Sequence, residues 1–412
     1  MSLLTSLLLV IVAARLLGQL CVRFGQPAIV GEMIAGVLLG PSVLGLVEPN
    51  EPLRGISELA VFLVVLSAGL EMNFRDVASM LRQRRSLAIA FLSFAFPLLA
   101  GIGVGLAFSL DVMRTVFLGL CVSITALPVT VRILESFGLL ESDIGRYSVA
   151  AAVLNDVAAL LALGVILNLT GSTTFPDIAW SILVTGGKLV LLAAAILGFN
   201  DLLERLHQRG VHLDTAPEKL VRVFGKEALF GIVVIFVLVF GSISDALGFH
   251  FVIGAFFGAL LIDRRFFLAS RYDNLERTLA SITAGFLAPV FFAYLGLEFT
   301  VTEMRGPLFV VVVIVVSIAS KIVSGWIGGR LAALPSREAL GLGIILNGRG
   351  IMELVVAGIA LQHGFIGQGL FSTLVLMGVL TTLLTPLLFQ RFVVPHLPAP
   401  RIAPRDPGAL PG

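Results

Sequence analysis

The sequence predicts an all-α polytopic membrane protein. Of its 412 residues, 58% are hydrophobic and only 13% are charged, whereas soluble domains carry about 25% charged residues. The apolar residues fall into runs of about 20, the length that one helix needs to cross a bilayer. No segment shows the alternating ten-residue pattern of a membrane β-barrel. The net charge of +2, without a dense basic stripe, gives no indication of a nucleic-acid partner.

About thirteen apolar runs end at charged residues or at Gly/Pro clusters, and each predicts one transmembrane helix. The first run is not a signal peptide, because it lacks a basic n-region and contains Arg15. The boundary between the eighth and ninth runs is the least sharply marked. The runs are 2–22, 27–46, 56–73, 87–110, 115–137, 144–169, 178–200, 227–247, 249–263, 275–297, 307–329, 338–361 and 369–392.

The loops between these runs alternate in charge. One set is rich in Arg and Lys, as in 201–226, while the other set offers only Arg54, Arg114 and Arg305. The positive-inside rule places the rich set in the cytoplasm. We therefore expect a multi-pass protein of the cell (inner) membrane, with its N-terminus outside and its C-terminus inside, which requires an odd number of spans.

The chain divides into a transmembrane domain, 1–392, and a tail. Within the domain we expect a first repeat at about 1–170, a linker helix at about 178–200 and a second repeat at about 227–392. Residues 393–412 are rich in proline and predict a disordered tail.

The two repeats are indicated by short matches with nearly constant spacing. The spans that they pair run in opposite directions in the predicted orientation, so the repeat is inverted. This layout is typical of secondary transporters, whose site lies where the repeats meet near the midplane. The matches are Pro27–Gly31 with His250–Gly254, Gly69–Met72 with Gly296–Phe299, and Leu118–Cys121 with Leu340–Gly343.

Ionisable residues inside the spans are few, and a charge at the bilayer centre costs about 2.5–3.5 kcal/mol on insertion scales. Asp156, beside Asn155, lies in the middle of the sixth run. Burial favours the neutral form of a carboxylate, so such a group holds either a proton or a small desolvated cation. That alternation predicts an exchanger, while a structural, hydrogen-bonding Asp is the alternative. The other ionisable residues inside the spans are Glu32, Arg132, Lys321, Arg349 and Glu353, with Glu71 and Glu298 near helix ends.

Two of the spans are expected to be broken helices that cross. In the fifth run a proline removes a backbone donor, and in the twelfth run glycines tolerate an unwound backbone. Broken helices present their ends and free carbonyls to ions. An ordinary proline kink and a glycine-rich helix contact are the alternative. The residues concerned are Ser123, Thr125, Ala126 and Pro128 in the fifth run, and Asn347, Gly348, Arg349 and Gly350 in the twelfth.

The remaining charges suggest pairing. Lys321 has no acid nearby in sequence, and Asp156 is its expected partner in space. An incoming cation that broke this pair would release a proton. Arg349 and Glu353 are spaced i, i+4 and predict a structural ion pair. Glu71 and Glu298 are expected at the membrane interface, and a role for Glu32 in the ion route is left open.

Three segments, 123–135, 145–160 and 347–355, resemble the monovalent cation:proton antiporter-2 family. They contain Thr-Ala-Leu-Pro-Val-Thr-Val-Arg, a mid-helix Asn-Asp, and Asn-Gly-Arg-Gly-Ile-Met-Glu-Leu-Val. The resemblance covers nearly all of 1–392. It implies the sodium/proton antiporter fold, with a core domain that holds two crossed, unwound helices and a dimerisation domain. It also implies a homodimer that works by an elevator-like motion.

The resemblance also assigns roles. Asp156 would carry the cation and the proton, with Asn155, Thr125 and Ser123 as further candidate ion-binding residues, and Lys321 would compensate charge. The Asn–Asp pair suggests electroneutral exchange, whereas the lysine is linked with electrogenic members, so the stoichiometry stays open. No nucleotide-binding regulatory domain is expected in this chain, which leaves a separate regulatory subunit as an alternative.

The expected function is therefore antiport of Na⁺ or K⁺ for H⁺ across the lipid bilayer, without a cofactor or a bound metal. The histidines lie at span ends or in loops, and no hydrolase constellation is present, so an enzyme is not expected. Two alternatives are kept. A sodium-coupled organic-anion symporter on a similar fold would need a roomy polar cavity, and a K⁺ efflux channel-like system would need a continuous pore.

Overall fold

The computed structural model describes residues 2–24, 26–70, 82–140, 142–169, 175–208, 227–264, 267, 269–300 and 302–396. Within these ranges all regular structure is helical, which confirms the predicted fold class. The predicted tail 393–412, beyond residue 396, and most of the polar connection 201–226 lie outside the described residues.

The helices follow the apolar runs of the sequence. They are α1 (Leu3–Arg23), α2 (Ala28–Leu39), α3 (Glu51–Leu70), α5 (Arg84–Ala107), α6 (Val112–Ser123), α7 (Leu127–Ser136), α8 (Asp143–Leu169), α9 (Phe175–Gln208), α11 (Glu227–Ala246), α12 (Phe251–Leu260), α13 (Ala269–Ile282), α14 (Ala288–Leu297), α15 (Pro307–Leu331), α16 (Ser336–Ile345), α17 (Ile351–Gln362) and α18 (Gln368–Phe392). A π-helical turn, Thr283–Leu287, joins α13 to α14.

These helices account for the expected spans. In the described part of the chain, nine helices, with α13 and α14 taken as one, are long and apolar enough to cross a membrane. The other four spans are the short helices α2 and α12 and the interrupted pairs α6–α7 and α16–α17.

Some predicted span ends are wrong. The second run was expected to reach residue 46, but α2 ends at Leu39, because Gly40 is extended and precedes Pro41. The tenth and seventh spans are longer than their apolar runs, since α13 begins at Ala269 and α9 covers Phe175–Gln208. Hydropathy locates the apolar part of a helix but not its polar ends.

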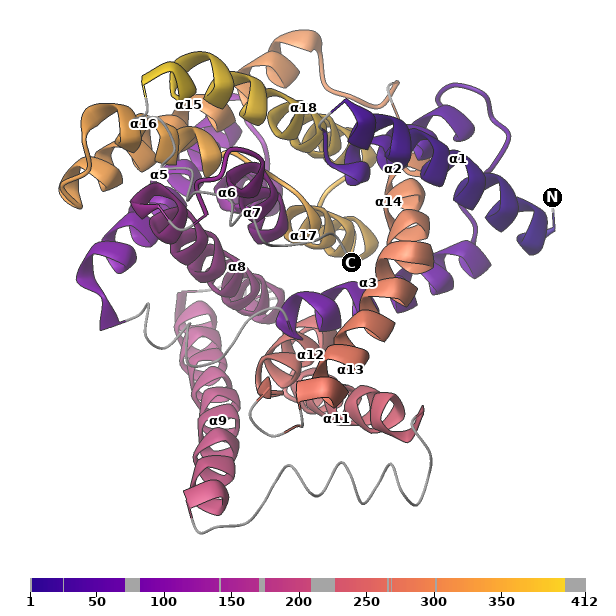
Figure 1. Cartoon of the computed structure of the whole chain (residues 1–412). Helices are drawn as coiled ribbons and strands as arrows, with labels where there is room; N and C mark the ends of the chain where they lie inside the picture. Colours follow the sequence, from indigo (N-terminus) through magenta and orange to yellow (C-terminus); the bar gives the residue numbers. More distant parts are fainter. Residues whose placement is uncertain are drawn as a thin grey trace, which may run out of the picture.

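The helices pack into two groups, which Figure 1 shows on different sides of the molecule. The core bundle consists of α5, α6, α7, α8, α15, α16, α17 and α18, and the flanking bundle consists of α1, α2, α3, α11, α12, α13 and α14. Helix α9 packs against α8 and, through Phe199, against Phe236 and Phe240 of α11. Each bundle thus takes three spans from each repeat.

Small residues show the same packing twice in the flanking bundle. Gly69 of α3 lies directly against Phe256 and Ala259 of α12. Gly296 of α14 lies in the same way against Met33 and Gly36 of α2. The sequence match of Gly69 with Gly296 therefore corresponds to equivalent places in the fold.

The core bundle repeats its packing as well. A Cβ on Gly101 of α5 would lie 2.7 Å from the Gly119 Cα of α6, and Gly325 of α15 faces Gly343 of α16 in the same way. Gly119 is therefore equivalent to Gly343. The sequence match, which set Gly119 opposite Gly341, is wrong by two residues, because the short apolar segments are too alike to fix the register.

Candidate functional site

The two interrupted helices meet inside the core bundle. Residues 124–126 separate α6 from α7, and residues 346–350 separate α16 from α17. The backbone N–H of Ala126 donates to the Gly348 carbonyl at 3.0 Å, and the Thr125 hydroxyl donates to the Leu346 carbonyl at 2.9 Å. The two unwound segments are thus hydrogen-bonded to each other, as a crossover requires.

Pro128 does not lie in the unwound segment. It is the second residue of α7, where a proline costs little because the first turn of a helix has no intrahelical partner for its N–H. The break therefore precedes the proline. Asn347, Gly348 and Gly350 do lie in the second unwound segment.

Two buried basic side chains occupy the C-terminal end of α6. The last carbonyls of a helix lack intrahelical donors and carry partial negative charge. Arg349 Nη1 donates to the Cys121 carbonyl and, at 3.5 Å, to Ile124, and Nη2 donates to Val122 at 2.7 Å. Lys321 Nζ donates to the Ser123 carbonyl at 2.5 Å. The broken helix end is therefore satisfied by charged donors.

The expected pair of Arg349 with Glu353 is present. Arg349 Nη1 and Glu353 Oε2 lie 3.7 Å apart, and both side chains are fully buried. Neither oxygen of Glu353 has a hydrogen-bond partner. The guanidinium is therefore held more closely by the carbonyls of α6 than by its acidic neighbour.

The direct ion pair expected between Lys321 and Asp156 is not formed. Besides the Ser123 carbonyl, Lys321 Nζ donates to the Ser93 carbonyl at 2.9 Å and to Thr125 Oγ1 at 2.7 Å. An ammonium has three donors, and all three are used by oxygens that carry no formal charge. The lysine and the aspartate lie within range of an electrostatic interaction, but they do not form an ion pair.

Asp156 and Asn155 lie in α8 against the crossover, and both are almost completely buried. The backbone N–H of Leu127, the first residue of α7, lies close to the Asp156 carboxylate. The Asn155 amide donates to Ser93 Oγ at 3.1 Å and to Thr125 Oγ1 at 3.4 Å. The carboxylate therefore faces the positive end of a half-helix.

Several buried polar atoms beside the crossover have no hydrogen-bond partner. In the described part of the chain these include Asp156 Oδ1, Thr130 Oγ1, and both Oδ1 and Nδ2 of Asn347. Buried polar groups are nearly always satisfied, so each exception requires an explanation. Oxygens at a helix break are the usual ligands of transported ions, and the oxygens of Asp156, Thr130 and Asn347 are free to serve as such.

Ser123 and Ser93 differ from the sequence-based expectation. The Ser123 hydroxyl donates to Leu120 of its own helix at 2.7 Å, so this residue reaches the site through its carbonyl. Ser93 of α5 was missed, although its hydroxyl and its carbonyl contact Asn155 and Lys321. It carries no charge, and its one signal in the sequence is Pro97, four residues later.

The other candidate charges lie elsewhere or outside the described part. Glu32 of α2 packs against Gly18 of α1, in the flanking bundle. Glu298, at the end of α14, accepts from Tyr294 Oη and from Gln368 Nε2, both at 2.8 Å. Glu71 and the side chain of Arg132 are not among the described groups.

Comparison with known proteins decides the family. The family model described as "Sodium/hydrogen exchanger, transmembrane" matches residues 6–394. The chain belongs to the sodium/hydrogen exchanger family. This is a family of membrane transporters and not of enzymes.

Relatives and solved structures agree with this assignment. The chain is 30% identical over 399 residues to Cation/H(+) antiporter 19 of Arabidopsis thaliana, covering 92% of this chain and 48% of that protein. It thus spans about half the length of the plant relatives. It is 26% identical to the Na(+)/H(+)-K(+) antiporter GerN of Bacillus cereus, covering 92% and 93% of the two chains. The structure of the sodium proton antiporter MjNhaP1 from Methanocaldococcus jannaschii matches with a TM-score of 0.67 at 15% identity, covering 94% and 97%.

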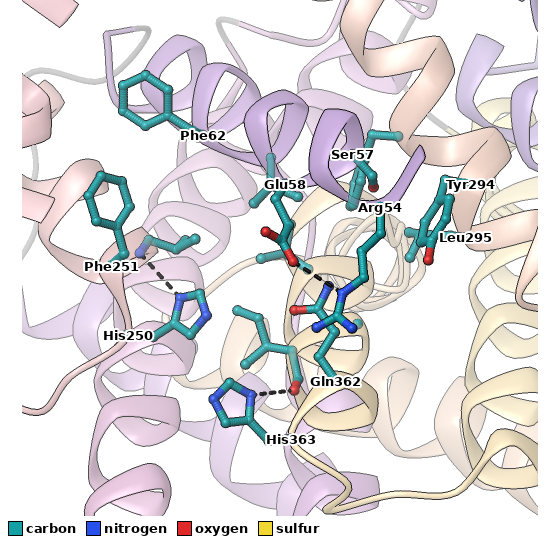
Figure 2. A pocket seen from close by; sticks show the side chains of 16 residues that line it. Arg54, Ser57, Glu58, Phe62, His250, Phe251, Tyr294, Leu295, Gln362 and His363 are labelled. Atoms are coloured by element: carbon teal, nitrogen blue, oxygen red, sulfur yellow. Dashed lines mark hydrogen bonds and ion pairs between the residues drawn. The ribbon is translucent and has the colours of Figure 1, made fainter. Parts of the chain in front are cut away.

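The protein has a cavity of about 460 Å³ between its two bundles, which we call the vestibule. Its walls come from α3, the start of α12 and α14 on one side and from α17 on the other. Figure 2 shows Glu58 beside Arg54, whose Nε donates to it at 3.2 Å, and His250 near His363. The two imidazole rings lie 5.9 Å apart. Sequence reasoning gave these histidines no role, yet they face each other across the boundary between the bundles.

Proposed function

We propose that the protein exchanges a monovalent cation, Na⁺ or K⁺, for H⁺, with Asp156 as the carrier of both ions. The observation that carries this proposal is a buried carboxylate oxygen without a hydrogen-bond partner, placed at the crossover of two broken helices. A buried, uncompensated charge is costly. The carboxylate therefore binds a proton or a desolvated cation, and one site cannot hold both.

The neighbours of Asp156 suit it for this alternation. The Leu127 N–H and the positive end of α7 stabilise the anion that a cation must meet. Asn155 is held by Ser93 and Thr125, which fixes its place beside the carboxylate. Thr130 and Asn347 supply further unpartnered polar atoms for a cation that has lost its water.

Lys321 and Arg349 keep fixed positions in this proposal. Both are held by carbonyls at the end of α6, so a cation need not displace the lysine from Asp156. This arrangement replaces the hypothesis of an ion pair that breaks on cation binding. Whether Lys321 changes its protonation during the cycle decides between electroneutral and electrogenic exchange.

Alternating access would move the core bundle, which carries Asp156, relative to the flanking bundle. The vestibule lies at their boundary, and its residues come from span ends that the loop charges assign to the outside. The protein would therefore have its N-terminus outside and its C-terminus in the cytoplasm. Helix α1 has an exposed apolar face, with Leu4, Leu8 and Leu16 more than half exposed, which suits lipid and a homodimer partner.

The test is exchange in proteoliposomes. Purified protein is reconstituted with an imposed pH gradient, and Na⁺ or K⁺ is added without any organic solute. We expect the cation to dissipate the gradient with wild type and with Asn155→Asp, but not with Asp156→Asn. Full activity of Asp156→Asn would refute the carrier role. Repeating the assay at an imposed membrane potential separates the stoichiometries, since electroneutral exchange is insensitive to voltage.

The same assay distinguishes cation/proton exchange from the two alternatives, an organic-anion symporter and a channel-like system. A requirement for an organic anion would favour the symporter. Currents that keep rising at high cation concentration, without coupled proton movement, would favour a channel-like system. The similarity of GerN, which is called a Na(+)/H(+)-K(+) antiporter, supports testing both Na⁺ and K⁺.

A further inference from the structure

Lys321 is held by two main-chain carbonyls that an ordinary helix would not offer. A carbonyl inside an α-helix accepts from the N–H four residues later. The Ser123 carbonyl is free because α6 ends there. The Ser93 carbonyl, however, lies in the middle of α5, which runs from Arg84 to Ala107.

Pro97 explains why this carbonyl is available. It lies inside α5, is buried, and is four residues beyond Ser93. Proline has no N–H, so the Ser93 carbonyl has no intrahelical donor at its usual position. Lys321 Nζ takes the place of that donor, at 2.9 Å.

We propose that Pro97 is a positioning residue for Lys321, because it releases the Ser93 carbonyl that anchors the ammonium. The inference deepens the proposed function, on which its transport readout rests. Ser93 also receives the Asn155 amide on its hydroxyl. The backbone of α5 at this point therefore sets the position of Lys321 relative to Asn155, the neighbour of the carrier Asp156.

Replacement of Pro97 by alanine restores the missing N–H. The Ser93 carbonyl then enters the helix ladder, and Lys321 loses one of its three acceptors. Taken alone, the change from proline to alanine should stabilise a helix, since proline in a helix interior is unfavourable. The loss of the hydrogen bond between Lys321 and the Ser93 carbonyl opposes this gain. This loss occurs only in a protein that retains Lys321.

The test is a double-mutant cycle of thermal stability in detergent, with Pro97→Ala, Lys321→Met and the double variant. We expect Pro97→Ala to raise the melting temperature clearly in the Lys321→Met background and to raise it less, or lower it, when Lys321 is present. Equal shifts in the two backgrounds would overturn the proposal. This readout needs no transport activity. Gly103→Ala is the matched control in α5, because an added Cβ there meets no atom within 4 Å, and its shift should be the same in both backgrounds.

The second readout is the pH profile of exchange in proteoliposomes. Arg349, Glu353 and Asp156 are the charged groups that act on Lys321, and a hydrogen bond to a charged group is worth enough to move its titration by about one pH unit. We expect the alkaline limb of the profile to move to lower pH by up to about one unit in Pro97→Ala, and not to move in Gly103→Ala. An unchanged profile in an active Pro97→Ala variant would contradict the proposal. If wild type itself showed no exchange, the proposed function would fail, while the stability cycle would still decide the role of Pro97.

Discussion

The capping of α6 by Arg349 leads to a quantitative prediction about the buried pair. Arg349→Gln removes close charged hydrogen bonds to the Cys121 and Val122 carbonyls and leaves Glu353 buried without its ion-pair partner. Breaking a buried pair in this way costs about 3–5 kcal/mol. Glu353→Gln removes only the 3.7 Å contact, because the carboxylate accepts no hydrogen bond. The arginine also keeps its carbonyls, so we expect a cost of about 1–2 kcal/mol.

The assay is thermal unfolding in detergent, monitored by size-exclusion chromatography. Arg349→Gln should melt well below Glu353→Gln, and the double variant should recover part of the loss because no unpaired carboxylate remains. Arg114→Gln is the matched control, since its 3.1 Å pair with Asp111 is exposed and worth at most about 1 kcal/mol. An equal or larger loss in Glu353→Gln would refute the view that Arg349 acts mainly on the end of α6.

Three further predictions concern packing, the crossover and orientation. Gly101→Leu should destabilise the protein by at least about 1–3 kcal/mol, because the facing backbone of α6 leaves no room, while Gly103→Leu should be neutral in the same melting assay. Thr125→Val, which removes the hydroxyl shared by Leu346, Asn155 and Lys321, should slow exchange in proteoliposomes at least about tenfold; an unchanged rate would contradict its role. A membrane-impermeant thiol reagent should label Ser2→Cys but not Arg391→Cys in intact cells, and the reverse pattern would invert the proposed orientation.

The sequence allowed the break between α16 and α17 to be predicted because its cause is local. Glycines permit an unwound backbone between α16 and α17, and hydropathy located the spans. Asp156 could be singled out for the same reason, since a charge in an apolar helix is visible without any partner.

The partner of Lys321 could not be predicted in this way. A search for acids found Asp156, whereas the structure surrounds the ammonium with a hydroxyl and two carbonyls. Every residue has a carbonyl, so its availability depends on where a helix ends or lacks a donor. Ser93 was missed for this reason, and the contact between His250 and His363 was missed because the two residues come from different bundles.

The most direct test of the central claim is proton release on cation binding. Na⁺ or K⁺ is added to purified protein in weakly buffered detergent solution with a pH-sensitive dye, and choline at equal ionic strength serves as the control. If Asp156 holds either a proton or a cation, wild type will release protons as the cation binds, and Asp156→Asn will release none. Equal release from the two proteins would show that another group carries the exchanged proton.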